Sequence, residues 1–363
     1  MIADRVKGLE PSGIRKIFDR VQTAKNPIDL IMGEPDFDVP MNIKEAGIKA
    51  ILDGKNKYTP TAGIKPLRDK LANNLAAKGI FFDDIMVTGG VSGGILLSCL
   101  TLINPGDEVI IPDPYFVMYK YVVSLCGGVP VFLDTYPDFH IREERFKKLL
   151  TKKTKLLILN SPNNPTGAVY SPNEIRMIAR YADSHNLIII SDEIYERFVY
   201  DEQEYLPIGA IHKSTVTLRG FAKTYAMTGW RLGYACGPAE IIRNMITMQQ
   251  YSFTCAPSVA QYAALEALST DVSEHITHYQ EKRDYIYNAL KAKYRVEKPE
   301  GAFYIFPEAG GSTSNEFLEI CLKKDLFIIP GDSFSQHNTH FRISFAAPME
   351  RLQKGAEILN SII

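Results

Sequence analysis

Short apolar runs alternate with stretches of helical periodicity over residues 84–236. Two of the runs, 156–159 and 187–190, are apolar at every position, as expected for strands that helices cover on both faces. We predict strands over residues 85–88, 108–111, 129–133, 156–160, 187–191, 215–218 and 233–236. This alternation predicts a three-layer α/β/α domain with a mostly parallel sheet.

Helical patterning and start signals predict further elements. We expect helices over 11–21, capped by Ser12, over 43–52, and over 66–78, with Pro66 in its first turn. Another helix begins at Pro172, because Ser171 and Glu174 form a capping-box sequence around it.

The pattern changes after residue 258. Two long helical stretches, 259–268 and 273–294, precede strand-like segments at 301–306, 326–329 and 341–345. Near the amino terminus, a short strand from Asp29 leads into a turn at 33–37. We therefore expect a large domain over 41–270 and a smaller α+β domain over 271–363, with residues 1–40 packing against the small domain.

Composition and charge exclude several classes of protein. The chain has 363 residues, of which 45% are hydrophobic and 23% charged, as in ordinary globular proteins. Lys plus Arg number 41 and Asp plus Glu 42, so no nucleic-acid partner is expected. The apolar run at 94–103 is shorter than the ~20 residues that span a bilayer, and residues 1–10 contain no signal-peptide core. We expect no membrane partner.

The cysteines and histidines also lack the spacing of special sites. Five scattered cysteines without C-x-x-C spacing indicate reduced thiols and a cytoplasmic protein. Two H-x-x-H spacings occur among seven histidines, but neither has the Cys or carboxylate partners that would complete a metal site. We expect no bound metal.

One stretch, 219–234, combines a lysine and an arginine with small residues directly after a predicted strand. In a partly dry pocket, the Lys223 amine would lose some of its preference for the charged form and act as a nucleophile or Schiff-base former. The planar guanidinium of Arg231 suits an oxyanion, most plausibly a phosphate. The alternative is a buried structural lysine beside an unrelated arginine.

Polar residues follow other predicted strands, where ligands of doubly wound sheets bind. Asp192 follows the strand at 187–191, and its carboxylate could keep a pyridine nitrogen protonated or could cap a helix. The rigid turn at 161–167 contains Asn164, although turn chemistry alone would explain its composition. The glycine cluster at 89–94 precedes a helical stretch and would let backbone N–H groups approach an anion.

The order of these segments resembles one family over residues 11–347, almost the whole chain. In sequence, they are G-E-P-D-F, Y-T-P-T-A-G, the glycine turn, D-P-Y-F, N-N-P-T-G, D-E-I-Y, F-A-K-T-Y-A-M-T-G-W-R-L-G-Y, G-A-F-Y and F-R-I-S-F-A. They are similar to the pyridoxal-phosphate (PLP) aminotransferases of class I/II and fold type I, which act on aspartate and aromatic amino acids among others. The resemblance implies that family's fold, with a large PLP-binding domain.

The resemblance implies roles for residues around the PLP ring. Lys223 would hold PLP as an internal aldimine, and Asp192 would pair with the ring nitrogen. Asn164 and Tyr195 would hydrogen-bond the phenolic oxygen, while Phe116 would stack on the ring. Lys223, Asp192 and Tyr195 are thus the expected catalytic residues.

Other residues would hold the phosphate and the substrate. The backbone at Val91 and Ser92, the Ser92 hydroxyl and Arg231 would bind the phosphate. In the family, Tyr58 reaches the phosphate from the neighbouring subunit, which implies a homodimer with shared active sites. Arg342 would bind the substrate α-carboxylate, with Gly33 and Asn164 beside it.

Four features depart from the family's pattern. Phe116 stands where Trp or Tyr is common, and Gly220 stands where some relatives use a serine to bond the phosphate. Gly93 and Gly94 are unusual at a helix start, where each costs about 1 kcal/mol relative to Ala. Ser92 replaces a lysine found in certain aspartate-directed relatives, which weakens an aspartate-specific interpretation.

The resemblance implies an aminotransferase that moves an amino group from an L-amino acid to a 2-oxo acid by a ping-pong mechanism. One alternative is a PLP-dependent C–S β-lyase on the same scaffold. Another is a non-catalytic regulatory domain, which this charge balance and the start of the pattern near residue 11 disfavour. The substrate depends on loops near 12–14, Phe37 and 251–254, whose placement the sequence does not determine.

Overall fold

The computed structural model describes residues 2–9, 17, 20–21, 24 and 26–363. Most of the helix expected over 11–21, including its Ser12 cap, lies outside the described residues, as does the expected specificity loop at 12–14. The first described helix is α1 (Asp4–Lys7).

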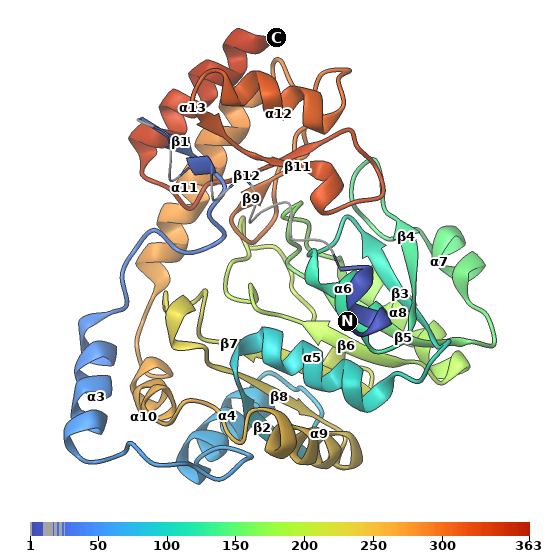
Figure 1. Ribbon diagram of the computed structural model, residues 1–363, viewed down its shortest axis with the longest axis vertical. Coiled ribbons are helices and arrows are strands. Elements are labelled where there is room, and N and C mark those ends of the chain that lie inside the picture. Colours follow the sequence, from blue (N-terminus) through green and yellow to red (C-terminus); the bar gives the residue numbers. More distant parts are fainter. Residues whose placement is uncertain (1, 10–16, 18–19, 22–23, 25) are drawn as a thin grey trace.

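One seven-stranded sheet forms the centre of the molecule (Figure 1). Its strands run in the order β2-β8-β7-β6-β5-β3-β4, and all neighbours are parallel except β8, which is antiparallel to β2 and β7. Their bounds are β2 (Asp84–Thr88), β3 (Glu108–Asp113), β4 (Val129–Asp134), β5 (Thr154–Asn160), β6 (Ile188–Asp192), β7 (Thr215–Gly220) and β8 (Gly233–Gly237). These are the seven strands predicted from the apolar runs, so the mostly parallel α/β fold is confirmed.

Both faces of this sheet are buried, because alternate residues of each central strand belong to different cores. In β5, Leu156 and Ile158 face one core, while Leu157 and Leu159 face the other. The first core lies under α5 (Gly90–Leu102), α6 (Met118–Leu125) and α9 (Ala239–Ser252). The second face is covered by α4 (Lys65–Ala77), α7 (Glu143–Leu149), α8 (Pro172–His185) and α10 (Ser258–Ala267). The three predicted layers are therefore present.

A second, smaller group of elements lies above the large sheet in Figure 1. It contains an antiparallel sheet in the order β11-β12-β9, with α11 (Ser273–Leu290), α12 (Ser314–Leu322) and α13 (Met349–Ile362). Its strands are β9 (Tyr304–Ile305), β11 (Ile329–Pro330) and β12 (Phe341–Ser344). They are shorter than expected: Ala302 has a positive φ of 55°, which interrupts the extended backbone predicted over 301–306.

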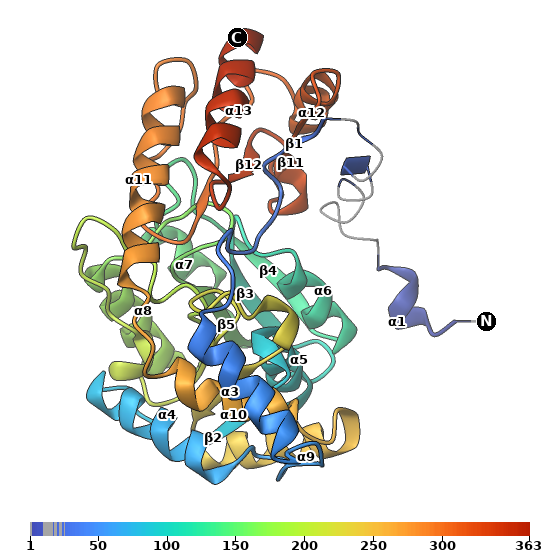
Figure 2. The same ribbon diagram turned by 90° about the vertical axis from the view of Figure 1, so that its left-hand side faces the viewer.

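The amino-terminal segment joins this smaller group. Strand β1 (Ile28–Asp29) pairs in parallel with β10 (Leu326–Phe327), and the N–H of Ser344 donates to the carbonyl of Leu30. Figure 2 shows the chain running from there down to α3 (Met41–Leu52), which packs against α10 beside the large sheet. Residues 30–37 therefore bridge the two sheets.

Within the described parts of the chain, none of the helices is long and apolar enough to cross a membrane. All five cysteines are free thiols, and three of them are buried.

The capping box at α8 satisfies two backbone N–H groups at the start of the helix. Ser171 Oγ accepts from the N–H of Glu174 at 3.3 Å, and Glu174 Oε2 accepts from the N–H of Ser171 at 2.8 Å, as the sequence predicted. We expect Ser171→Ala to lower the free energy of unfolding by about 0.5–2 kcal/mol, measured by urea denaturation. The control is Ser184→Ala, which removes an exposed hydroxyl from the last turn of the same helix and should change stability by less than about 0.5 kcal/mol. Equal effects of the two substitutions would contradict the capping role.

Candidate active site

A cavity of about 510 Å³ opens where the two sheets meet, beyond the carboxyl ends of the parallel strands. Every site residue predicted from the sequence lines it except Tyr58. Those brought together are Gly33, Val91, Ser92, Phe116, Asn164, Asp192, Tyr195, Lys223, Arg231 and Arg342. Residues separated by more than 300 positions therefore converge on one volume, as expected for a ligand site in an α/β fold.

Lys223 lies in the turn that follows β7 and extends its amine into the cavity. Its Nζ donates to the carbonyl of Gly33 at 2.5 Å. Burial lowers the pKa of this amine to about 8; the Glu34 carboxylate opposes the shift, while the nearby Arg342 and Arg231 add to it. The amine is therefore far more often neutral near pH 7 than a solvated lysine, which suits a nucleophile.

Asp192 is the last residue of β6 and is buried. Its carboxylate accepts hydrogen bonds from Tyr119 Oη at 2.7 Å and from the N–H of Ile194 at 3.2 Å. Burial raises the pKa of Asp192 to about 6, against the lowering effect of these two hydrogen bonds. A cation placed beside this carboxylate would favour its charged form. Residues 194–197 form a turn, so the alternative that Asp192 caps a helix is wrong.

The start of α5 and Arg231 together form a cradle for an anion. In the described structure no side chain caps α5, whose first N–H groups have no intrahelical acceptors. Gly90 has a φ of 75°, and a Cβ there would lie 2.7 Å from Arg231 Nη2. A Cβ on Gly233 would lie 2.7 Å from the backbone N of Val91. Glycine at both positions lets the arginine and the helix start approach each other, which is the geometry of anion sites.

Arg342 lies at the opposite end of the cavity on β12 and is buried. Its Nη1 donates to Asn164 Oδ1 at 3.0 Å, and its Nη2 donates to the carbonyl of Ile31 at 2.7 Å. Its Nε has no hydrogen-bond partner among the described residues. A buried guanidinium without a carboxylate beside it, and with an unsatisfied donor, is suited to bind an incoming carboxylate.

Phe116 and Tyr58 occupy different environments. Phe116 lines the cavity and packs edge-on against Tyr119, with ring centroids 5.7 Å apart. Tyr58 lies outside the cavity, and 85% of its surface is exposed. Within one chain, the structure therefore does not bring Tyr58 to the other predicted site residues.

Comparison with known proteins identifies the family. The family model described as "Aminotransferase class I and II" matches residues 25–359. The chain is 40% identical to a probable aspartate aminotransferase of Methanocaldococcus jannaschii, with full coverage of both chains. It is 38% identical to aromatic-amino-acid aminotransferase 2 of Thermococcus litoralis, covering 100% of this chain and 98% of the relative. The chain belongs to the class I and II aminotransferases.

Solved structures agree with this assignment. A single mutant of the Thermus thermophilus aspartate aminotransferase is 35% identical, with a TM-score of 0.96 and complete coverage of both chains. This aminotransferase therefore has fold type I, and its activity is amino-group transfer. Since the relatives are named aminotransferases, the alternative of a C–S β-lyase is not favoured.

Several cavity residues of this aminotransferase were not predicted from the sequence, among them the polar residues Tyr119, Asn160 and Tyr304. Asn160 donates from Nδ2 to the carbonyl of Asp192 at 3.0 Å and accepts from the N–H of Asn164 at 2.9 Å. In the sequence, Tyr119 and Tyr304 look like ordinary core aromatics. Two signals could have found residues of this group: Asn160 ends a predicted strand, and Tyr304 lies in the G-A-F-Y motif.

Close packing explains two of the unusual glycines, Gly94 and Gly220. Gly93 and Gly94 lie inside α5 and are buried, and a Cβ on Gly94 would lie 3.0 Å from Leu218 Cδ2. A Cβ on Gly220 would lie 3.0 Å from Val91 Cγ2 and 3.1 Å from Ile194 Cδ1. A serine at position 220 would therefore require its neighbours to shift.

We expect the Lys223 amine of the cofactor-free protein to react with acetylating reagents along a pH curve centred near 8. Only neutral amine reacts, so at pH 7 about one tenth of Lys223 is reactive, against about one in 3,000 for a lysine with the ordinary pKa. Peptide mass spectrometry measures the extent of modification, with exposed Lys291 as internal reference.

Glu34→Gln is the matched variant for this measurement. The Glu34 carboxylate favours the charged amine, so its removal should move the midpoint of Lys223 to lower pH. A wild-type midpoint above 10, or an upward shift in the variant, would contradict the electrostatics described for the cavity.

Proposed function

We propose that this aminotransferase binds PLP in the cavity and uses it to move an amino group from an L-amino acid to a 2-oxo acid. The observation that carries the proposal is the placement of Lys223, with a pKa lowered to about 8, between a buried carboxylate and two arginines in one cavity. Perturbed titratable groups that converge in a cleft are characteristic of catalytic sites.

The residues present fit PLP at each of its chemical groups. The cradle of Gly90, Val91, Ser92 and Arg231 suits the phosphate, because it combines unpaired N–H groups with a guanidinium. Asp192 suits the ring nitrogen, since the raised pKa of a buried carboxyl falls when a cation lies beside it. We assign the phenolic oxygen to Asn164 and Tyr195 and the ring face to Phe116, which all line the same cavity.

When bound, PLP supplies an electron sink that stabilises negative charge on the substrate Cα. The chain's own residues orient the substrate and move the proton. Arg342 binds the α-carboxylate, with Gly33 and Asn164 beside it. The amine of Lys223, whose lowered pKa favours the neutral form, takes the proton from Cα, and general acid–base catalysis of this kind contributes typically ~10²–10⁴-fold.

The transfer proceeds in two half-reactions with ping-pong kinetics, because the first 2-oxo acid leaves before the second binds. As amino donor we propose aspartate or an aromatic amino acid, since relatives are named for each and align with the full chain. A panel of both donor types with 2-oxoglutarate, pyruvate and oxaloacetate as acceptors tests this choice.

We expect Lys223→Ala to lose at least ~10²–10⁴-fold of the turnover and the visible absorbance that wild type retains after gel filtration with PLP. The control is Lys291→Ala, which removes an exposed lysine and should leave both properties unchanged. Wild-type half-reactions analysed for products distinguish the alternatives: amino transfer yields pyridoxamine phosphate and a 2-oxo acid, whereas a β-lyase yields pyruvate, ammonia and a thiol. A fully active Lys223→Ala enzyme would refute the proposal.

We propose the domain boundaries given by the sequence: 41–270 for PLP binding and 271–363 for the small domain, with 1–40 attached to the latter. The pairing of β1 with β10 supports the attachment of the amino-terminal segment. The free cysteines support a cytoplasmic location.

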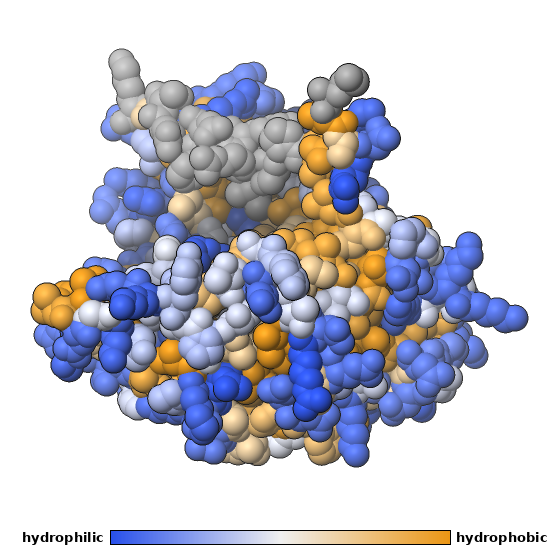
Figure 3. Space-filling model, turned by 60° about the horizontal axis from the view of Figure 1, so that its bottom comes forward, coloured by the Kyte–Doolittle hydropathy of each residue, from blue (hydrophilic) through white to orange (hydrophobic). Residues whose placement is uncertain are grey.

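We further propose a homodimer in which Tyr58 reaches the phosphate site of the partner subunit. The loop around Tyr58 is held by its neighbours: Gln249 Nε2 donates to the carbonyl of Thr61 at 2.7 Å, and Ser258 Oγ donates to the carbonyl of Lys55 at 2.7 Å. It nevertheless presents the Tyr58 ring to solvent, and 83% of Tyr251, near the end of α9, is exposed. Figure 3 shows hydrophobic residues interspersed with hydrophilic ones on the face that includes the bottom of the molecule in Figure 1. Such exposure is typical of an uncovered interface.

Subunit complementation tests this arrangement. Tyr58→Phe should weaken PLP binding about 10- to 150-fold, the effect of losing a hydrogen bond to a charged group. When Tyr58→Phe and Lys223→Ala chains exchange subunits, half of the dimers are mixed, and one site in each combines an intact Lys223 with an intact Tyr58. At PLP concentrations that saturate only wild type, the mixture should recover about one quarter of wild-type activity. Activity no greater than the mean of the two parents would show that Tyr58 does not act across the interface.

A further inference from the structure

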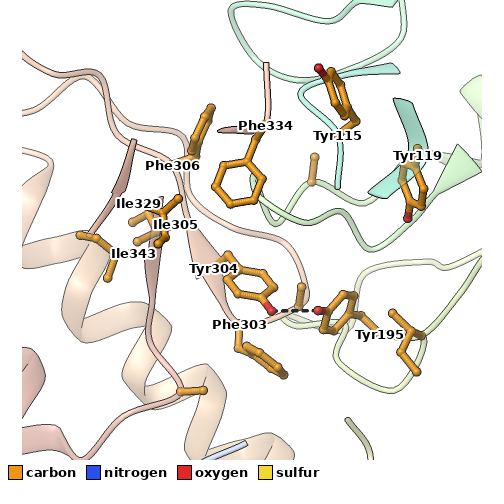
Figure 4. Packing of buried hydrophobic residues seen from close by; sticks show 14 of the residues in the cluster. Tyr115, Tyr119, Tyr195, Phe303, Tyr304, Ile305, Phe306, Ile329, Phe334 and Ile343 are labelled. Atoms are coloured by element: carbon orange, nitrogen blue, oxygen red, sulfur yellow. Dashed lines mark hydrogen bonds between the residues drawn. The ribbon is translucent and has the colours of Figure 1, made fainter. Parts of the chain in front are cut away.

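Tyr304 connects the two sheets inside the cavity. It lies on β9 opposite Ser344 of β12, and its side chain is buried. Figure 4 shows its ring extending from the smaller sheet toward Tyr195, which follows β6 of the large sheet. None of the roles assigned above involves Tyr304.

The first contact of Tyr304 is with a predicted cofactor residue. The hydroxyls of Tyr304 and Tyr195 are 2.8 Å apart, and either can be the donor. Burial raises the pKa of both hydroxyls, so both are protonated near neutral pH. When Tyr304 donates to Tyr195, the proton of Tyr195 is left to point into the cavity. A chain of two hydroxyls polarised in this direction makes Tyr195 a stronger donor than an isolated tyrosine.

The second contact of Tyr304 is with the carboxylate-binding arginine. The guanidinium of Arg342 lies over the rings of Tyr304 and Phe334, 4.6 Å from each ring centroid. Two aromatic rings therefore contact the guanidinium, while Asn164 and the carbonyl of Ile31 accept hydrogen bonds from its Nη atoms. Stacking of this kind fixes the direction in which the donor fork points.

A third contact explains why position 33 requires glycine. A Cβ on Gly33 would lie 2.8 Å from the hydroxyl oxygen of Tyr304. The carbonyl of Gly33 also accepts from Lys223 Nζ. The Tyr304 hydroxyl is thus packed against the backbone that holds the reactive amine, and it has little freedom to move.

We propose that Tyr304 is a positioning residue with two separable roles, an inference that rests on the function proposed above. Its hydroxyl orients the Tyr195 proton toward the phenolic oxygen of bound PLP. Its ring, together with that of Phe334, orients Arg342 toward the α-carboxylate of the substrate. Besides Tyr195 and Tyr304, the titratable and charged side chains that line this cavity are Tyr119, Glu34, Asp192, Lys223, Arg231 and Arg342.

Tyr304→Phe tests the hydroxyl, because it keeps the ring. In this variant Tyr195 donates more weakly to the phenolic oxygen of bound PLP, so the negative charge on that oxygen is less stabilised. That oxygen then holds the proton on the neighbouring nitrogen of Lys223 more strongly, and this proton is lost at higher pH. We expect the pH midpoint of the visible absorbance change of the PLP-loaded enzyme to rise by about 0.5–1 unit. The control is Tyr294→Phe, which removes another buried hydroxyl, bonded at 2.6 Å to the carbonyl of Leu359, and should leave the midpoint unchanged.

Tyr304→Leu tests the ring. The affinity of the loaded enzyme for unreactive carboxylates, with succinate and 3-phenylpropionate as probes, should fall about 2- to 30-fold. Tyr304→Phe should bind both probes as wild type does. If Tyr304→Leu fails to fold, Phe334→Leu removes the other ring that contacts the Arg342 guanidinium and should give the same loss of carboxylate affinity.

A wild-type midpoint in Tyr304→Phe would overturn the role of the hydroxyl. Unchanged carboxylate affinity in the leucine variants would overturn the role of the ring. A wild-type protein that binds no PLP would instead refute the proposed function, so the two failures are distinguishable.

Discussion

The parallel register of β5 and β6 organises the active site. It places Asn160 opposite Asp192 at the last position of both strands. The Asn160 side chain then binds the carbonyl of Asp192 and the N–H of Asn164, which ties the 161–167 turn to the end of β6. A shift of one residue in the register of β6 against β5 would turn the Asp192 side chain to the other face of the sheet. The cavity therefore depends on a pairing that the buried apolar residues of both strands enforce.

Burial gives the cavity its reactivity by acting in opposite directions on an amine and an acid. It lowers the pKa of Lys223 to about 8 and raises that of Asp192 to about 6, so the charged form of each is disfavoured. Their neighbours limit these shifts: Glu34 favours the charged amine, and Tyr119 favours the carboxylate. Each group is consequently near the point at which a ligand of opposite charge or a proton transfer changes its state.

The sequence predicts the large sheet well because its strands are apolar on both faces, and a continuous apolar run can be recognised in one sequence without related sequences. The order of motifs then locates most cavity residues, since each follows a strand or begins a helix. The small sheet is less predictable: β9 and β11 have two residues each, and long-range contacts rather than local preference define them. Tyr119 and Tyr304 were missed because a buried aromatic in a cavity wall has the same local pattern as one in the core. Tyr58 is exposed outside the cavity of its own chain, so its proposed role at the site requires a partner subunit.

The two halves of the site come from different sheets, and this division links the proposed carboxylate-binding arginine to the proposed cofactor residues. Lys223, Asp192 and Asn164 follow strands of the large sheet, whereas Arg342 lies on β12 and holds the carbonyl of Ile31 in the amino-terminal segment. In this structure Arg342 Nη1 donates its hydrogen bond to Asn164 Oδ1. A carboxylate that replaced it there would release the amide oxygen of Asn164, which lies in the turn tied to Asp192 by Asn160. A buried amide oxygen needs a hydrogen-bond donor. The hydrogen bonds of Arg342 therefore cannot change without a change in those of Asn164, which Asn160 ties to Asp192.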